Sequence, residues 1–374
     1  MQRITFILSF VVLIACTIGC EKKNGIDDDL SFLNTTATSN LNKIFDISND
    51  NSGNVKITPT GEGVSSFTVN YGQGGDSAVV MPGGSTTHSY PEGSYTVSIT
   101  ARDIAGKPTV TTYPLQLTYI SPENLTVSLT QNVHNLKVKA TALYAASYLV
   151  YFGDVANEVG TPLAKGAEIS HDYATAGKYN VKVVALSGGA AKSEKITEVK
   201  ITDPFGLPID FENEWVDYFF GTFGGGQQFV TTVNPDKSGL NLSNSVGKFT
   251  RGFDSWSGTY SPLNVPIDFA TGNKIKVLVY NPDPALIGKK LNVELEKGKT
   301  AAGTAIADGI AVLKVPVTKS GVWEELVFDY STISAIPATA KFSQLVLRFN
   351  DEKNGDGVGG TGSVIYVDNF KFTK

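Results

Sequence analysis

Cysteine is almost absent from this chain of 374 residues, since the only two are Cys16 and Cys20. The body that follows them therefore has no disulfide framework and no thiol chemistry. Positive charge is also scarce, with 31 Lys and Arg against 36 Asp and Glu, and no basic stripe is present. This balance excludes the electrostatic footprint of a nucleic-acid-binding protein. No run longer than about ten residues combines helical periodicity with helix caps, whereas short alternating apolar segments recur between turn residues. We expect an all-β protein.

Catalytic motifs are missing too. The chain has no Gly-x-Ser-x-Gly, no His-Glu-x-x-His, no P-loop and no dinucleotide-binding glycine motif in a strand-to-helix setting. A glycosidase needs only two carboxylates, and the best pairs are Glu212 with Glu214 and Glu294 with Glu296. Because apolar residues alternate through 291–295 and form the buried face, we interpret Glu294 and Glu296 as exposed strand acids. The prediction is that the protein is not an enzyme.

The apolar run 4–18 follows Arg3 and ends abruptly at a glycine and Cys20. It is too short for a spanning helix and is typical of a secretory signal with a lipid-acceptor cysteine. Cys20 gives a normal signal length and a polar sequel, whereas Cys16 has the better lipobox in Leu-Ile-Ala-Cys. We favour Cys20, with Cys16 as the alternative; an ordinary signal peptide or an uncleaved anchor is the other interpretation.

The segment 20–37 is polar and includes three consecutive aspartates. Such a composition cannot bury a core, so after the signal peptide of 1–19 we expect a flexible tether. The acidic cluster resembles the surface-export signal of Bacteroidetes lipoproteins. That resemblance implies lipid anchoring in the outer membrane with display at the cell surface, and the periplasmic face is the alternative.

Two consecutive segments form an internal repeat, with domains expected at 38–120 and 121–203. His88 and His171 stand 83 residues apart, each in His-x-Tyr followed by Gly-x-Tyr-x-Val. An aromatic-Gly-Asp turn precedes this pattern in the second copy, and the first copy departs from it. The pattern resembles PKD domains, which implies two Ig-like β-sandwiches acting as spacers. We interpret both histidines as structural, although a repeat face could also touch ligand.

The remaining segment, 204–374, contains all three tryptophans and a different composition. Its alternating patterns predict six strands, at 274–280, 291–297, 309–317, 323–330, 342–350 and 363–372. About 170 residues of this kind are expected to form a jelly-roll β-sandwich.

Three pieces of this last domain resemble carbohydrate-binding modules of Bacteroidetes polysaccharide-utilisation proteins, including modules attached to laminarinases. They are 208–212, 234–241 with 246–249 and 256–258, and 365–370. The resemblance implies binding of a β-glucan, with laminarin, a β-1,3/1,6-glucan, as the first candidate. It also implies a SusC/SusD-like outer-membrane transporter as partner.

A sugar site needs an aromatic platform for the apolar face of the pyranose ring and short polar partners for its hydroxyls. The stretch 251–260 offers both, with Trp256 and Tyr260 as platforms and Arg251 and Asp254 as hydroxyl partners. Trp215, beside a glycine-rich loop, and Trp323 are further candidates for the site. The notable alternative for each tryptophan is burial in the core.

A structural Ca²⁺ is implied by the same resemblance, since such modules often pin their first and last strands with this ion. Calcium prefers carboxylate and carbonyl oxygens, and Asp210, Glu212 and Asp368 are placed for that role. No catalytic cofactor is expected.

The sequence therefore predicts a non-catalytic surface lipoprotein that captures polysaccharide for an uptake system. A surface adhesin or structural protein-binding lipoprotein is the alternative from another class. A glycoside hydrolase or lyase is the third.

Overall fold

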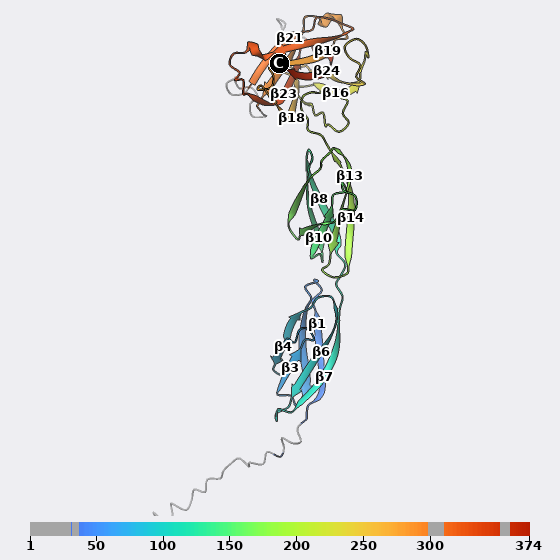
Figure 1. The fold of residues 1–374 in the computed structure, drawn as a ribbon, viewed down its shortest axis with the longest axis vertical. Helices are drawn as coiled ribbons and strands as arrows, with labels where there is room; N and C mark the ends of the chain where they lie inside the picture. Colours follow the sequence, from blue (N-terminus) through green and yellow to red (C-terminus); the bar gives the residue numbers. More distant parts are fainter. Residues whose placement is uncertain (1–30, 32–36, 298–309, 352–359) are drawn as a thin grey trace, which may run out of the picture. The chain divides into compact units, whose positions relative to one another are not determined.

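The computed structural model describes residues 31, 37–297, 310–351 and 360–374. Within these residues the elements are β-strands and short 3-10 turns, and the strands pair into six sheets (Figure 1). The expected all-β fold class is confirmed. Across the same residues no helix is long and apolar enough to span a bilayer. Cys16, Cys20 and nearly all of the tether lie outside the described residues, so their roles stay predictions.

The first repeat contains two sheets, with strand orders β1-β2-β5 and β4-β3-β6-β7. Its strands are β1 (Ser39–Ile47), β2 (Asn54–Glu62), β3 (Ser66–Asn70), β4 (Ser77–Val80), β5 (Thr86–Ser89), β6 (Gly93–Arg102) and β7 (Pro108–Leu117). Val97 and Ile99 of β6 face one buried core with Phe67 and Val69 of β3, as a period of two requires.

The second repeat has the same arrangement, with orders β8-β9-β12 and β11-β10-β13-β14. Its strands are β8 (Glu123–Asn132), β9 (Asn135–Leu143), β10 (Ser147–Tyr151), β11 (Thr161–Ala164), β12 (Glu168–Asp172), β13 (Gly177–Leu186) and β14 (Lys192–Ile201). Each strand has a counterpart in the first repeat, in agreement with the sequence offsets.

The repeated histidines occupy equivalent aromatic stacks. His88 stacks on Tyr71 with ring centroids 4.1 Å apart, and His171 stacks on Phe152 at 4.2 Å. Each also meets the Tyr two positions later edge-on. The imidazole of His171 bonds Asp154 at 2.7 Å, which fixes the ring further. These contacts support the structural interpretation of both residues.

The C-terminal segment forms two five-stranded sheets, β15-β18-β23-β20-β21 and β16-β17-β24-β19-β22. Its strands are β15 (Gly221–Phe223), β16 (Gln228–Val233), β17 (Ser245–Thr250), β18 (Gly258–Asp268), β19 (Lys274–Tyr280), β20 (Lys290–Glu296), β21 (Ile310–Pro316), β22 (Trp323–Asp329), β23 (Lys341–Phe349) and β24 (Val364–Thr373). The six strands predicted here agree with the structure to within one residue at each end. The strands from β15 to β18 were not predicted.

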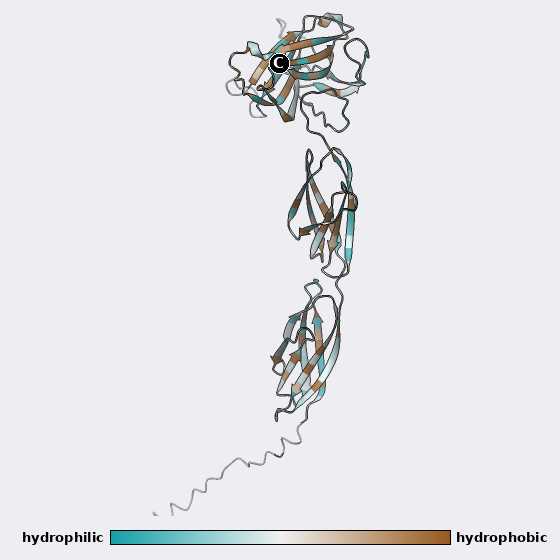
Figure 2. Cartoon of the chain, in the orientation of Figure 1, coloured by the Kyte–Doolittle hydropathy of each residue, from teal (hydrophilic) through white to brown (hydrophobic). Residues whose placement is uncertain are grey.

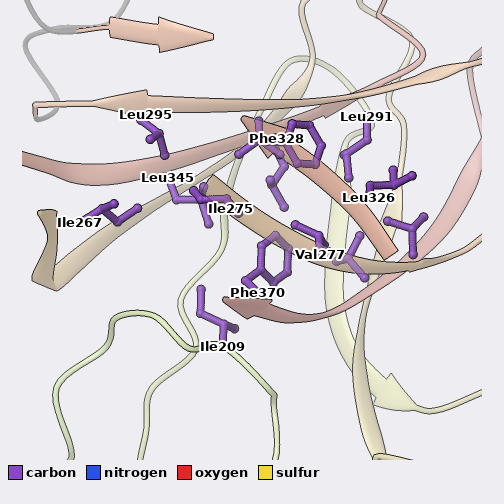
Figure 3. Close-up of a cluster of buried hydrophobic side chains, with 14 of the residues drawn as sticks. Ile209, Ile267, Ile275, Val277, Leu291, Leu295, Leu326, Phe328, Leu345 and Phe370 are labelled. Carbon is purple, nitrogen blue, oxygen red and sulfur yellow. The ribbon is translucent and has the colours of Figure 1, made fainter. Parts of the chain in front are cut away.

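Apolar side chains from both C-terminal sheets fill one core (Figure 3). Leu291, Val293 and Leu295 of β20 enter it from one sheet, and Ile275 and Val277 of β19 from the other. Apolar and polar residues alternate along the strands (Figure 2), so each sheet has an inner and an outer face. This division determines which side chains are available for a site.

The contacts of the chain divide it into two compact units. One contains 1–126, 141–149 and 184–194, and the other contains 127–140, 150–183 and 195–374. This division does not follow the domain limits expected at 120/121 and 203/204, so those limits stay a prediction.

Candidate functional site

One sheet of the C-terminal segment has aromatic and polar side chains on the side away from the core. In β15-β18-β23-β20-β21, residues directly opposite each other on paired strands share a face. The register pairs Asn292 with Arg348 and Glu296 with Gln344, while their neighbours in sequence face the core. We call this side the outer face. By register it includes Phe223, Tyr260, Pro262, Asn292, Glu294, Glu296, Ile310, Val312, Lys314, Gln344, Val346 and Arg348.

Aromatic rings gather at the β15-β18 edge of the outer face. Phe223 pairs with Gly258, and a Cβ on that glycine would lie 2.8 Å from the Phe223 ring and from the Arg348 side chain. The missing side chain therefore lets both groups approach the sheet. Trp256, in the preceding loop, holds its ring parallel to Phe223 with centroids 6.2 Å apart and is 53% exposed. Tyr260 lies half-buried on the same face.

Polar side chains fill the centre of the outer face. Asn292 donates to Glu294 at 2.9 Å, and Arg348 makes an ion pair with the same carboxylate at 3.1 Å. Gln344 donates to Glu296. The Arg348 guanidinium also lies 5.4 Å from the Phe223 ring centroid, within the range of a cation–π contact. The aromatic edge and the polar centre are thus physically joined through Arg348.

Both glutamates of the outer face are buried, contrary to the interpretation of them as exposed strand acids. Alternation places them away from the core, but it does not say whether other parts of the chain cover them. Burial raises the pKa of Glu294 above its ordinary value, and the Arg348 charge opposes that rise. Burial also raises the pKa of Glu296, and the hydrogen bond from Gln344 opposes it. A charged carboxylate is therefore costly at both positions.

Two acceptors on this face have no hydrogen-bond partner among the described residues. They are Oδ1 of Asn292 and Oε1 of Gln344, both in buried side chains. A buried acceptor without a donor costs free energy. Both oxygens are shielded from solvent, so a sugar ring can reach the aromatic rings at the edge of the face and not these acceptors.

Asp254 positions the aromatic loop. Its Oδ2 accepts a hydrogen bond from the Gly225 N–H at 2.6 Å, and the Phe253 N–H donates to the Gly225 carbonyl at 2.8 Å. These bonds join the glycine-rich loop to the Trp256 loop. Asp254 therefore holds the backbone of the loop that carries Trp256. The sequence predicts a different role for this residue, that of a hydrogen-bond partner for a sugar hydroxyl.

Two predicted site residues are not on the outer face. Trp323 is 4% exposed, packs against Tyr280 and donates from Nε1 to the Asp236 carbonyl at 2.7 Å. It belongs to an apolar cluster in the other sheet and so lies apart from Trp256 and Tyr260. Arg251 is 1% exposed. It follows β17 and is buried, so it cannot serve as a surface hydroxyl partner.

Trp215 lies beside residues that precede the C-terminal sheets. Its carbonyl accepts from the Asp203 N–H at 2.8 Å, and its ring lies 5.7 Å from the Lys200 ammonium. None of these contacts involves Trp256 or Tyr260. Of the predicted site residues, the structure thus brings Trp256, Tyr260 and Asp254 together and leaves Trp215 apart.

The three predicted calcium ligands are only partly assembled. Glu212 accepts from the Ser245 N–H at 2.6 Å and from Asn244 at 2.9 Å, so both of its oxygens are engaged. Asp368 is fully buried, and burial, together with the charge of Asp210, raises its pKa to about 6. A cation between Asp210 and Asp368 would relieve that repulsion. In the described part of the chain no three His, Cys, Asp or Glu side chains form a metal-binding group.

Several members of the outer face were missed by sequence reasoning. Phe223 stands in a three-residue strand without an alternating pattern, and Arg348 and Gln344 were taken only as part of a strand. Strand parity places Asn292, Glu294 and Glu296 on one face, and that signal was available. Parity does not say which strand lies beside β20, because that neighbour depends on pairing between strands that are distant in sequence.

No protein-family model matches the chain, and no curated protein does either. Among solved structures, a carbohydrate-binding module of the β-sandwich superfamily is 14% identical, with 68% of this chain and 99% of that chain covered and a TM-score of 0.31. A family 11 carbohydrate-binding module from a cellulosomal cellulase of Clostridium thermocellum is 15% identical. The match covers 46% of this chain and 95% of that chain, with a TM-score of 0.30. SGBP-B, from a complex xyloglucan utilization locus in Bacteroides uniformis, is 11% identical. The match covers 90% of this chain and 98% of that chain, also with a TM-score of 0.30.

Proposed function

We propose that the protein is a non-catalytic glycan-binding protein whose C-terminal segment captures polysaccharide on the outer face. One observation carries this proposal: the Trp256 ring, which is 53% exposed, lies parallel to the Phe223 ring, and the half-buried Tyr260 lies on the same face. Exposed aromatic rings accept the apolar side of a pyranose. Two of the similar structures are carbohydrate-binding modules and the third comes from a xyloglucan utilization locus, which agrees with this class of ligand.

The finer proposal concerns the glycan and the setting. The sequence resemblance to modules of laminarin-utilisation systems favours a β-glucan such as laminarin. The predicted lipid on Cys20 would hold the chain in the outer membrane at the cell surface. There it would serve a SusC/SusD-like transporter, with the two repeats as spacers.

The arrangement of the carboxylates favours binding over hydrolysis. Glu294 is held by Asn292 and by Arg348, and Glu296 is held by Gln344. A glycosidase requires two carboxyl groups that both reach the scissile bond. Glu294 and Glu296 are buried, so neither is accessible to a substrate.

Affinity electrophoresis of the full chain against a polysaccharide panel tests the proposal. We expect retardation by laminarin and no release of reducing ends. Migration unaffected by every glycan in the panel would overturn glycan binding and favour a protein-binding adhesin. Release of reducing ends would favour a hydrolase.

A structural Ca²⁺ belongs to the same proposal, with Asp210 and Asp368 as its carboxylate ligands. The buried, raised-pKa carboxyl of Asp368 beside Asp210 supports it. Glu212 is not included, because Asp210 is the only carboxylate whose charge raises the pKa of Asp368.

A further inference from the structure

A pocket of about 430 Å³ lies at one end of the outer face. Its lining comes from the tip of the β8–β9 hairpin, from the segment after β14, from residues before β15 and from β18. All of these residues belong to the compact unit formed by 127–140, 150–183 and 195–374. The volume falls within the range of about 300–1,000 Å³ that is usual for ligand sites.

The hairpin tip is fixed to the wall of this pocket by side-chain hydrogen bonds. Gln131 donates to the Thr202 hydroxyl at 3.3 Å, and His134 bonds Asp203 at 3.1 Å. The second oxygen of Asp203 accepts from Asn213 at 3.1 Å. One carboxylate thus links the hairpin with the segment that leads into the C-terminal sheets.

The pocket continues the outer face. Phe219, a lining residue that is 47% exposed, meets Tyr260 edge-on with ring centroids 5.8 Å apart. Pro262, also in the lining, lies opposite Gln344 in the register, as Tyr260 lies opposite Val346. A ligand that extends past Tyr260 along β18 therefore reaches the pocket.

The chemistry of the lining matches a neutral sugar. Amides come from Gln131, Asn132 and Asn264, and carboxylates from Asp203 and Asp217. The amides donate hydrogen bonds to hydroxyls and accept them, and the carboxylates accept them, while the exposed ring of Phe219 offers an apolar surface. The lining contains no Lys or Arg, so it has no cation to pair with a uronate or sulfate.

We propose that this pocket is a second subsite for the same glycan chain, so that the β8–β9 hairpin of the second repeat contacts ligand. The subsite rests on the proposed function, because it extends the site on the outer face. It binds an uncharged sugar unit some distance along the chain from the unit held at Trp256. Long oligosaccharides therefore bind more tightly than short ones.

Calorimetry on the full chain with laminaribiose and longer laminari-oligosaccharides tests this subsite. The double variant Asn132→Ala with Asp217→Ala removes two exposed lining side chains. It should lower the affinity for the long oligosaccharides about tenfold and leave laminaribiose binding unchanged. Trp256→Ala should weaken binding of both lengths. Lys165→Ala, on an exposed turn of the same repeat outside the lining, is the matched control and should change neither.

The outcomes separate the subsite from the proposed function. Wild-type affinity of the double variant for long oligosaccharides would overturn the subsite alone. Absence of binding by the wild-type chain at every length would overturn glycan binding and the subsite with it. Thermal unfolding of each variant checks that lost affinity does not come from lost folding.

Discussion

Trp256 and Phe223 hold parallel rings 6.2 Å apart, one in a loop and the other on the edge strand β15. The pair exists because β15 joins the sheet beside β18, which places Phe223 against Gly258, two residues after Trp256. Arg348 then reaches the Phe223 ring from the next strand. The relationship joins three segments that are distant in sequence into one aromatic and polar surface.

Replacing Trp256 with Ala should abolish retardation by laminarin. About half of this side chain is already exposed, so the thermal midpoint should move by less than about 2 °C. Affinity electrophoresis and a thermal scan on the same preparation check both expectations. Val159→Ala, which truncates an exposed residue of the second repeat, is the control and should bind normally. A folded Trp256→Ala protein with normal retardation would exclude this ring from the site.

Replacing Trp323 with Phe should lower stability and leave glycan binding unchanged, which is the opposite of the expectation for Trp256→Ala. The substitution removes the bond from Nε1 to the Asp236 carbonyl and part of a buried ring. We expect the free energy of unfolding to fall by about 1–3 kcal/mol, while glycan binding stays unchanged. Urea denaturation measures the first quantity and electrophoresis the second. Weakened binding at full stability would return Trp323 to the site.

Replacing Asp254 with Ala should weaken glycan binding several-fold without contact to the sugar. The variant leaves the Gly225 N–H without its acceptor and loosens the loop that carries Trp256. Asp254→Asn retains a side-chain oxygen and should recover most of the affinity. Titration calorimetry compares the two, and equal losses would instead indicate that the carboxylate charge itself meets ligand.

The buried Glu294 predicts a pH dependence of stability. Burial raises its folded-state pKa above the unfolded value, so the folded state binds the proton more tightly. Its ionisation cost is absent below the unfolded pKa and grows as pH rises through the folded pKa. Glu294→Gln should therefore gain stability relative to wild type as pH rises above the ordinary glutamate pKa of about 4.3. Urea denaturation at each pH measures the difference, and a flat difference would contradict the prediction.

Calcium removal tests the pair Asp210 and Asp368. Chelation should lower the thermal midpoint by several degrees, because two neighbouring carboxylates lose the cation that offsets their repulsion. Added Ca²⁺ should restore it, and added Mg²⁺ should not, since Mg²⁺ requires a smaller octahedral site. Asp368→Asn should remove the response. A thermal midpoint of the wild-type chain that does not change when chelator is added would show that calcium does not contribute to stability.

The C-terminal strands with clean alternation could be located from the sequence, because period-two patterning is a local property. β15 could not be located in this way, because three residues beside a glycine-rich loop are too few to show an alternating pattern. The site shows the same division. Trp256 and Tyr260 lie close together in sequence and were found, while Phe223 and Arg348 join them only through strand pairing.

The all-β class, the internal repeat and the parity of β20 can be derived from the sequence, and that parity puts Asn292, Glu294 and Glu296 on the face opposite Leu291, Val293 and Leu295. The burial of these glutamates, and the packing of Trp323 in an apolar cluster apart from the main core, appear only in the folded structure. Burial depends on what packs over a face. Parity, in contrast, comes from the geometry of a single strand.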